Sequence, residues 1–335
     1  RHRILVDAIQ RDIGPRGELD ALGKRTLAVF ETMLQCRRRY GPDAVGLDVV
    51  SGVGGPDDVL APLLLAQWAE AYDKKKDTIA LDLAPQFDSV ETLERCGDVM
   101  RDLLADPLYR RHVDRRGRRQ VVLVGYSESS KESGLCASRY AAYRAQGAIA
   151  ASLAAAGEQH VVFHARGGSV SRGGGRIDAL VRAMPPSTVN GLLRLTEQGE
   201  LVAQNYGLPP IAMRTLERVF NSLALATQAG RDMRASEPAP EQFDIGERVA
   251  VESRRRYRGL VWDEPQFYDY FRLATPIDVI ERMQIAARPA VRDGVGGIAG
   301  LRAVPWVFAW TQTRALLPGW FGAGTGLSAV LQEKG

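Results

Sequence analysis

The sequence predicts an α/β fold built on a parallel sheet, and three observations lead to this fold class. Short runs rich in Val, Ile and Leu recur between longer segments with helical periodicity, a pattern typical of a sheet covered on both faces. Polar residues follow the ends of these runs, as they do where parallel strands open onto a ligand site. The composition, 45% hydrophobic and 25% charged, is that of a folded globular protein.

The predicted elements alternate along the first part of the chain. Strands are expected at 44–50, 78–83, 120–125 and 160–164, where aliphatic and β-branched residues are concentrated. Helices are expected between them at 57–72, 90–105 and 136–155, and the arginine-rich run 110–119 is interpreted as a solvated turn. After Arg194 the pattern changes. From Pro210 onward long helices are expected, with a proline-containing connector at 237–242.

Composition and charge exclude several classes of function. Lys plus Arg exceeds Asp plus Glu by 44 − 40 = 4, and this excess is spread along the chain, so we expect small anions and no nucleic acid as partners. No export signal is recognisable, and no apolar run approaches the roughly 20 residues of a membrane span. The cysteines Cys36, Cys96 and Cys136 form no CxxC pair, which argues against a zinc site and a disulfide framework. We therefore expect a cytoplasmic protein that does not enter a membrane.

Several polar side chains come directly after predicted strands. Asp88 follows the second strand, Glu128 and Lys131 follow the third, and Arg166 and Arg172 follow the fourth. Loops at the carboxyl ends of parallel strands converge, and the helix N-termini there favour anions. The sequence thus predicts a single anion-binding site at this edge of the sheet.

The segment GYSESSKESG, at 125–134, is expected to form a loop between a buried strand and a helix, with Glu128 and Lys131 projecting from it three residues apart. Positive charge in this chain is mostly arginine, so Lys131 suggests a task for a compact ammonium group, such as proton transfer. The alternative interpretation is a helix cap with solvated charges.

The segment FHARGGSVSRGGGR, at 163–176, places Arg166 and Arg172 in a glycine-rich loop where guanidinium and backbone N–H groups can bind phosphate or carboxylate. His164 either orients a ligand or fills the strand end. An RGG-type nucleic-acid segment is the competing interpretation, but such segments are long and repetitive.

A third segment, at 287–314, carries Arg288, Arg292 and Arg302 around a glycine-rich bend, which suggests a lid that moves. The aromatic residues that follow it are expected to pack in a core: Trp306, Phe308 and Trp310.

These segments, together with LRLTEQGE, YFRLATP, ARPAVR and LRAVPWVFAWTQTR, stand in an order that resembles the signature blocks of phosphoenolpyruvate carboxylases. The resemblance runs through nearly the whole chain. It implies part of a TIM-like (β/α)8 barrel with many additional helices and a mainly α-helical C-terminal part, a homotetramer, and Mg²⁺ or Mn²⁺. It also implies one incomplete catalytic domain over 1–335, with later barrel strands in 1–200 and a helical extension with a mobile Arg/Gly loop in 201–335.

The resemblance assigns the metal to Asp88 and Glu128, where the family usually has Glu at the first position and Asp at the second. Ala165 and Val291 also depart from the family pattern, which has Gly and a basic residue there. The resemblance assigns catalytic roles to Lys131, His164, Arg166 and Arg172. It assigns substrate binding to Arg166, Gly167, Gly168, Arg288 and Arg302.

The implied reaction is the carboxylation of phosphoenolpyruvate by bicarbonate, through carboxyphosphate and the enolate of pyruvate, to oxaloacetate and phosphate. This lyase reaction fixes carbon dioxide and is anaplerotic for the tricarboxylic acid cycle. The family's TAHPT-type histidine motif and its C-terminal block have no counterpart in 1–335, so we expect this segment alone to be inactive. Two alternatives remain: a diverged, non-catalytic relative that keeps the anion pocket, and another metal-dependent barrel lyase that uses phosphoenolpyruvate or pyruvate.

Overall fold

The computed structural model describes residues 1–70, 72–73, 78–231, 238–285 and 288–333. It divides into two compact units. The first comprises Arg1–Phe87, Arg95–Leu123 and Gly147–Phe163, and the second comprises Asp88–Glu94, Val124–Gln146 and His164–Gly335. None of the helices in the described part of the chain could span a lipid bilayer.

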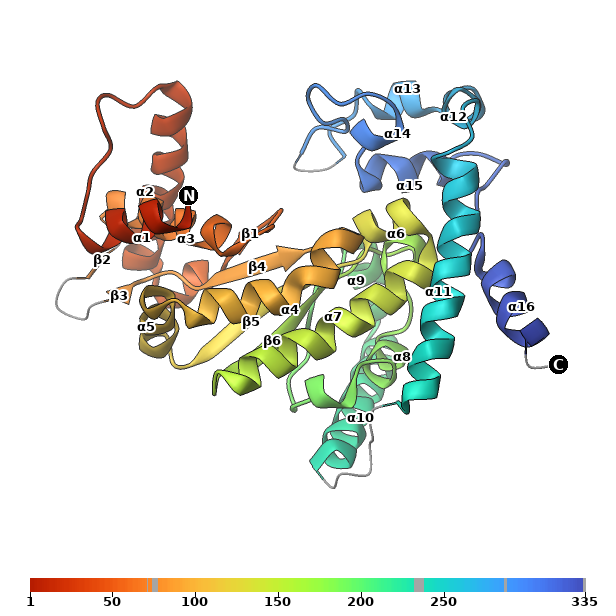
Figure 1. The fold of residues 1–335 in the computed structure, drawn as a ribbon, viewed down its shortest axis with the longest axis horizontal. Coiled ribbons are helices and arrows are strands. Elements are labelled where there is room, and N and C mark those ends of the chain that lie inside the picture. The colour runs from red at the N-terminus through yellow and green to blue at the C-terminus, as the bar shows by residue number, and fades with distance from the viewer. Residues whose placement is uncertain (71, 74–77, 232–237, 286–287, 334–335) are drawn as a thin grey trace. The chain divides into compact units, whose positions relative to one another are not determined.

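The strands form a five-stranded sheet and a separate two-stranded sheet (Figure 1). The larger sheet has the order β1-β4-β5-β6-β7, and β1 pairs with β4 in parallel, with Asp48 opposite Leu83. Its strands are β1 (Asp48–Val50), β4 (Leu83–Phe87), β5 (Arg119–Gly125), β6 (Gln159–Ala165) and β7 (Arg194–Leu195). The antiparallel pair is β2 (Tyr72–Asp73) and β3 (Thr78–Ile79). Over the described residues the larger sheet is open, with β1 and β7 at its edges.

The next group of elements is the α-helices that precede β7 in the chain. They are α1 (His2–Gln10), α2 (Ala21–Tyr40), α3 (Pro56–Trp68), α4 (Val90–Ala105), α5 (Pro107–Arg115), α6 (Ser127–Ser133), α7 (Leu135–Ala155) and α8 (Ile177–Arg182). Short 3₁₀ turns occur at η1 (Pro42–Val45), η2 (Val170–Arg172) and η3 (Pro186–Thr188).

The part of the chain after β7 is mainly helical, as the sequence predicts. Its helices are α9 (Gly199–Tyr206), α10 (Pro209–Arg231), α11 (Pro240–Val261), α12 (Phe267–Ala274), α13 (Ile277–Ile280), α14 (Gly297–Gly300), α15 (Ala303–Thr311) and α16 (Ala323–Glu333). The α11 and α16 helices run side by side (Figure 1).

The predicted α/β class is confirmed, and several element predictions need correction. The strand predicted at 44–50 is limited to Asp48–Val50, because a 3₁₀ turn occupies Pro42–Val45. The strand predicted at 78–83 is instead split: Thr78–Ile79 belongs to the small sheet, and Leu83–Phe87 enters the large one. The run 110–119, interpreted as a turn, lies largely in α5. The predicted connector 237–242 begins outside the described residues, and α11 already starts at Pro240.

Each unit has its own apolar core. In the first, Ala84, Val121 and Val161 of neighbouring strands are buried together. The second is centred on aromatic rings: Phe271 lies 4.8 Å from Trp306 between ring centroids, and Trp306 meets Trp310 edge-on at 5.5 Å. The prediction that Trp306 and Trp310 pack in a core is confirmed. Phe308 is 37% exposed and was predicted wrongly, because it lies on the outer side of α15.

Candidate active site

The short helix α6 carries the two charged residues that the sequence analysis selected. The segment predicted as a loop forms a helix from Ser127 to Ser133, directly after β5. Lys131 is only 3% exposed, so the alternative reading of solvated charges is wrong for this residue. The helix therefore places a buried ammonium group inside the second unit.

Glu128 contacts the glycine-rich segment at 287–314, which the sequence analysis interprets as a lid. Its Oε2 lies 3.0 Å from Nη2 of Arg292, and its Oε1 accepts a hydrogen bond of 3.3 Å from the N–H of Ala303. Arg292 also donates to the carbonyl of Ala299 at 2.8 Å. The carboxylate is thus held by a cation and by the first N–H of α15, a favourable place for an anion.

Lys131 is held by an aromatic ring. Its Nζ lies 5.2 Å from the ring centroid of Trp262, and the guanidinium of Arg258 lies 5.1 Å from the same centroid. Burial lowers the pKa of Lys131 to about 8; Arg292 also lowers it, whereas Glu128 and Glu132 raise it. The face of an indole ring attracts an ammonium group electrostatically, so Trp262 stabilises the charged form of Lys131.

The low pKa of Lys131 predicts an unusual pH dependence of stability. Below pH 8 the buried ammonium is charged in both states, so its desolvation cost is present in full; between pH 8 and the ordinary value of 10.5 the folded protein has already lost the proton, and stability rises with pH. Lys131→Met is therefore expected to raise the free energy of unfolding at pH 7, by about 1–3 kcal/mol, with a smaller gain at pH 10. Urea unfolding at both pH values measures this. A less stable variant at pH 7 would mean that the contact with Trp262 outweighs desolvation.

Asp88 lies in the turn between β4 and α4, and its backbone is bonded to α6. The Asp88 carbonyl accepts a hydrogen bond of 2.9 Å from the N–H of Ser129, the residue after Glu128. Its own N–H donates to Oγ1 of Thr92 at 3.2 Å. The two predicted metal ligands thus stand on segments that are hydrogen-bonded to each other.

The donor set at this place suits Mg²⁺. Mg²⁺ is usually bound through one or two carboxylates, with waters and substrate phosphates completing its shell. Asp88 and Glu128 would supply two carboxylates, and their role as metal ligands stays a prediction. Among the described residues no group of three or more His, Cys, Asp or Glu could hold a metal by itself, so a fully protein-enclosed cage is not expected there.

Arg166 is buried inside the glycine-rich loop that it helps to form. It is 8% exposed; its Nε donates to the carbonyl of Gly173 at 2.9 Å and its Nη2 to that of Gly175 at 2.5 Å. Burial lowers the pKa of its guanidinium. Two of the five guanidinium N–H groups bond within the loop, and the other three have no hydrogen-bond acceptor among the described residues, so they can reach a ligand.

The glycines of this loop allow close backbone contacts with Arg172. The Gly167 N–H donates to the carbonyl of Arg172 at 2.7 Å, and a Cβ at Gly167 would lie 2.5 Å from the Cβ of Arg172. The N–H of Gly168 donates to Oε1 of Gln198 at 3.4 Å. The Nε of Arg172 reaches Oγ of Ser127 on α6 at 3.3 Å, which connects the loop to the helix of Glu128 and Lys131.

His164 is fully buried at the end of β6. Its Nδ1 lies 2.8 Å from the hydroxyl of Tyr126, and its Nε2 is buried without a partner among the described residues. Burial first, then Arg166 and Arg139, lower the pKa of His164 to about 3, while burial raises that of Tyr126 to about 12. His164 is therefore a neutral imidazole near pH 7, suited to orienting neighbours and not to carrying positive charge.

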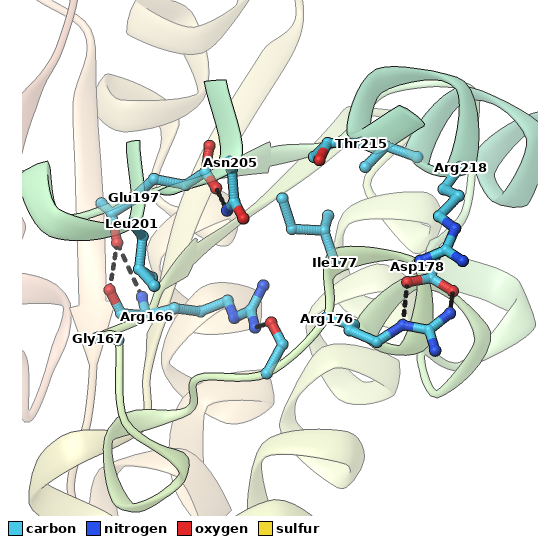
Figure 2. A pocket seen from close by; sticks show the side chains of 14 residues that line it. Arg166, Gly167, Arg176, Ile177, Asp178, Glu197, Leu201, Asn205, Thr215 and Arg218 are labelled. Atoms are coloured by element: carbon cyan, nitrogen blue, oxygen red, sulfur yellow. Dashed lines mark hydrogen bonds and ion pairs between the residues drawn. The ribbon is translucent and has the colours of Figure 1, made fainter. Parts of the chain in front are cut away.

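Two cavities divide the predicted site residues. Figure 2 shows the first, of about 290 Å³, which Arg166 lines together with Glu197 and Leu201, and in which Glu197 accepts a hydrogen bond from Asn205 at 3.1 Å. The second, of about 160 Å³, is lined by Lys131 together with Trp306 and other apolar side chains. Gly167 and Gly168 line the first cavity with Arg166. Lys131 and Arg166 thus open onto different cavities.

Arg288 and Arg302 line neither of these cavities. Arg302 donates through Nε to the carbonyl of Pro289 at 2.9 Å, and a bridge between Val291 and Leu301 pairs the two arms of the segment. Their predicted substrate roles stay predictions. The sequence analysis missed Trp262, whose ring contacts Lys131 from outside α6, and Glu132, which lies in α6 itself and accepts a hydrogen bond from the N–H of Val90. A single tryptophan or glutamate carries no local signal for such a contact.

Comparison with known proteins identifies the family. The family model described as phosphoenolpyruvate carboxylase matches residues 1–335. Curated relatives named phosphoenolpyruvate carboxylase include one from Xanthomonas campestris pv. campestris (strain 8004), 42% identical over 91% of this chain and 33% of its own length. Others are from Mycobacterium avium (strain 104), 39% identical over 93% of this chain and 34% of its own, and Thermosynechococcus vestitus, 37% identical over 95% and 32%.

The chain spans about a third of the length of these relatives. The family match covers both structural units, including α6, the glycine-rich loop and the segment around Arg292. The chain belongs to the phosphoenolpyruvate carboxylase family.

Proposed function

We propose that the protein in which this chain occurs carboxylates phosphoenolpyruvate with bicarbonate, giving oxaloacetate and phosphate. The observation that carries the proposal is the family match over all 335 residues, joined to a site that has carboxylates and cations of the required types on neighbouring segments. The named relatives are phosphoenolpyruvate carboxylases, and their name supports the same substrate here.

The anionic substrates would be held by cationic and N–H donors. We assign the phosphate and carboxylate of phosphoenolpyruvate to Arg166, Arg288, Arg302 and the N–H groups of Gly167 and Gly168. Support comes from Arg166, whose unused donors line the cavity of Figure 2. Arg172 would lie beside the bicarbonate-derived group.

Asp88 and Glu128 would hold Mg²⁺ or Mn²⁺, which when bound would supply positive charge to the phosphate and enolate oxygens. In the first step a bicarbonate oxygen attacks phosphorus, a new O–P bond forms, and the P–O bond to the enolate breaks. Carboxyphosphate then yields phosphate and carbon dioxide, which adds to the enolate carbon. The arginines stabilise the enolate charge as it develops.

Lys131 would handle protons in this reaction. A buried amine with a pKa of about 8 exchanges a proton readily near neutral pH, which an arginine cannot do. It can donate to the bicarbonate-derived carboxyl group or accept its proton. His164, neutral and hydrogen-bonded to Tyr126, would orient the glycine-rich loop that follows β6.

The rest of the proposal concerns the setting of the site. We infer that the open sheet forms part of a TIM-like barrel that other segments complete, that the protein is a cytoplasmic homotetramer, and that its oxaloacetate is anaplerotic for the tricarboxylic acid cycle. The five-stranded sheet order and the strand-end location of the site support the barrel.

A second candidate is a non-catalytic relative. The exchanged lengths of Asp88 and Glu128, and the salt bridge that already occupies Glu128, favour it. In that case the anion cavity would remain and carboxylation would be lost.

An assay of oxaloacetate formation separates the two. With phosphoenolpyruvate, bicarbonate and Mg²⁺, the protein that contains this chain is expected to release oxaloacetate and phosphate in equal amounts, measured by reduction of oxaloacetate with malate dehydrogenase. The 335-residue chain alone is expected to release none. Absence of oxaloacetate from the longer protein, with phosphoenolpyruvate still bound, would contradict carboxylation and favour the non-catalytic relative.

A further inference from the structure

The turn that carries Asp88 is fastened to α6 at two points. The N–H of Ser129 donates to the Asp88 carbonyl at 2.9 Å, and Oε2 of Glu132 accepts a hydrogen bond of 2.9 Å from the N–H of Val90. Val90 is the first residue of α4, and the first N–H groups of a helix have no partner within it. Glu132, from a different helix, supplies that missing partner.

Glu132 is itself held in place. It lies in the last turn of α6, and its backbone carbonyl accepts a hydrogen bond of 3.3 Å from Nη1 of Arg258 on α11. The side chain is half-buried, and its charge lies close enough to Glu128, Lys131 and Asp88 to interact with all three. The Glu132 carboxylate thus connects the C-terminal end of α6, which Arg258 stabilises, to the turn that carries Asp88.

This bridge bears on the two predicted metal ligands, because one stands on the turn and the other on α6. Metal ligands must be held within about 0.5 Å of a productive arrangement by the groups around them. Asp88 is one methylene shorter, and Glu128 one methylene longer, than the residues usual at these positions. The distance between the turn and α6 therefore decides whether both carboxylates can reach one cation.

We propose that Glu132 is a positioning residue: its hydrogen bond to Val90 holds the Asp88 turn against α6, so that the carboxylates of Asp88 and Glu128 reach one divalent cation. The inference rests on the proposed function. It assigns Glu132 an effect through the backbone, with no contact to the metal.

The test compares Mn²⁺ binding by the full chain and its variants, with free Mn²⁺ measured by electron paramagnetic resonance. Glu132→Ala removes the acceptor and is expected to weaken Mn²⁺ binding by about 10- to 100-fold. Glu132→Gln removes the charge but keeps an amide oxygen that can accept from Val90, so its affinity should stay close to that of the wild type. Glu94→Gln, on the exposed side of α4, is the matched charge control and should change nothing.

Hydrogen exchange of the Val90 amide provides a second measurement that does not depend on metal. Protection should fall in Glu132→Ala and persist in Glu132→Gln. If the alanine variant does not fold, Glu132→Asp takes its place with the same expectation, since its shorter side chain keeps the charge but not the reach.

Equal loss of Mn²⁺ affinity in the alanine and glutamine variants, a greater loss in glutamine, or no loss in alanine would each overturn the inference. In these three cases the wild type still binds Mn²⁺ and the proposed function stands. A wild-type chain that binds no Mn²⁺ would instead remove the metal site from the proposed function, and the positioning role with it.

Discussion

Arg166→Met is expected to lower kcat/KM for oxaloacetate formation by at least about a hundredfold in the protein that carries this chain. The side chain is buried, joins Gly173 and Gly175 through their carbonyls, and presents its remaining donors to the cavity of Figure 2. Methionine fills similar volume but leaves two carbonyls without their donor and the substrate without a cation. Steady-state kinetics with varied phosphoenolpyruvate measures the loss.

Two further variants sharpen this result. Arg166→Lys keeps the charge but cannot bond both carbonyls and a substrate oxygen in one plane, so a large loss is expected there as well. Arg101→Met, at an exposed arginine on α4, should leave the kinetics unchanged. Near-normal activity of the lysine variant would show that a point charge is sufficient and that the fork geometry is not used.

Gly174→Ala is expected to lower the free energy of unfolding of the second unit by about 1–3 kcal/mol or more. A Cβ at Gly174 would overlap the carbonyl group of Gly168. This carbonyl belongs to the backbone of the same tight loop, so it cannot rotate aside. Chemical unfolding followed by tryptophan fluorescence measures this, because four of the five tryptophans lie in that unit.

Gly259→Ala is the matched control. Gly259 lies within α11, and a Cβ there meets nothing within 4 Å. Alanine should therefore raise stability, by about 0.4–1 kcal/mol, through a less flexible unfolded chain. A similar change in both variants would contradict the steric argument for Gly174.

The fold could be predicted best where one periodicity dominates. The strands at 120–125 and 160–164 and the helix at 90–105 match β5, β6 and α4 within a residue at each end, because uninterrupted apolar runs and a clear helical repeat leave no competing pattern. The second strand, predicted at 78–83, enters the large sheet only at Leu83–Phe87, a run that contains Pro85, which lacks an N–H and is uncommon inside a sheet. In the structure Pro85 is tolerated beside Val50 of the short β1.

The site could be predicted by residue type but not by contact. Glu128 and Lys131 were selected from their place after a strand, and the structure joins Glu128 to Arg292. The support around them was not predictable: the hydrogen bond from Arg258 to Glu132 joins residues 126 positions apart, a separation at which sequence periodicity carries no information. The closure of a barrel could likewise not be predicted from these residues, because their strands form an open sheet.

The salt bridge between Glu128 and Arg292 has a thermodynamic consequence. A divalent cation that reaches Glu128 arrives beside a guanidinium of like charge, so occupancy by one disfavours the other. By linkage the effect is mutual. The factor by which the salt bridge of Arg292 lowers metal affinity equals the factor by which bound metal would weaken the packing of the segment at 288–302. If Glu128 binds the metal as proposed, release of that segment and metal binding would be linked in one equilibrium.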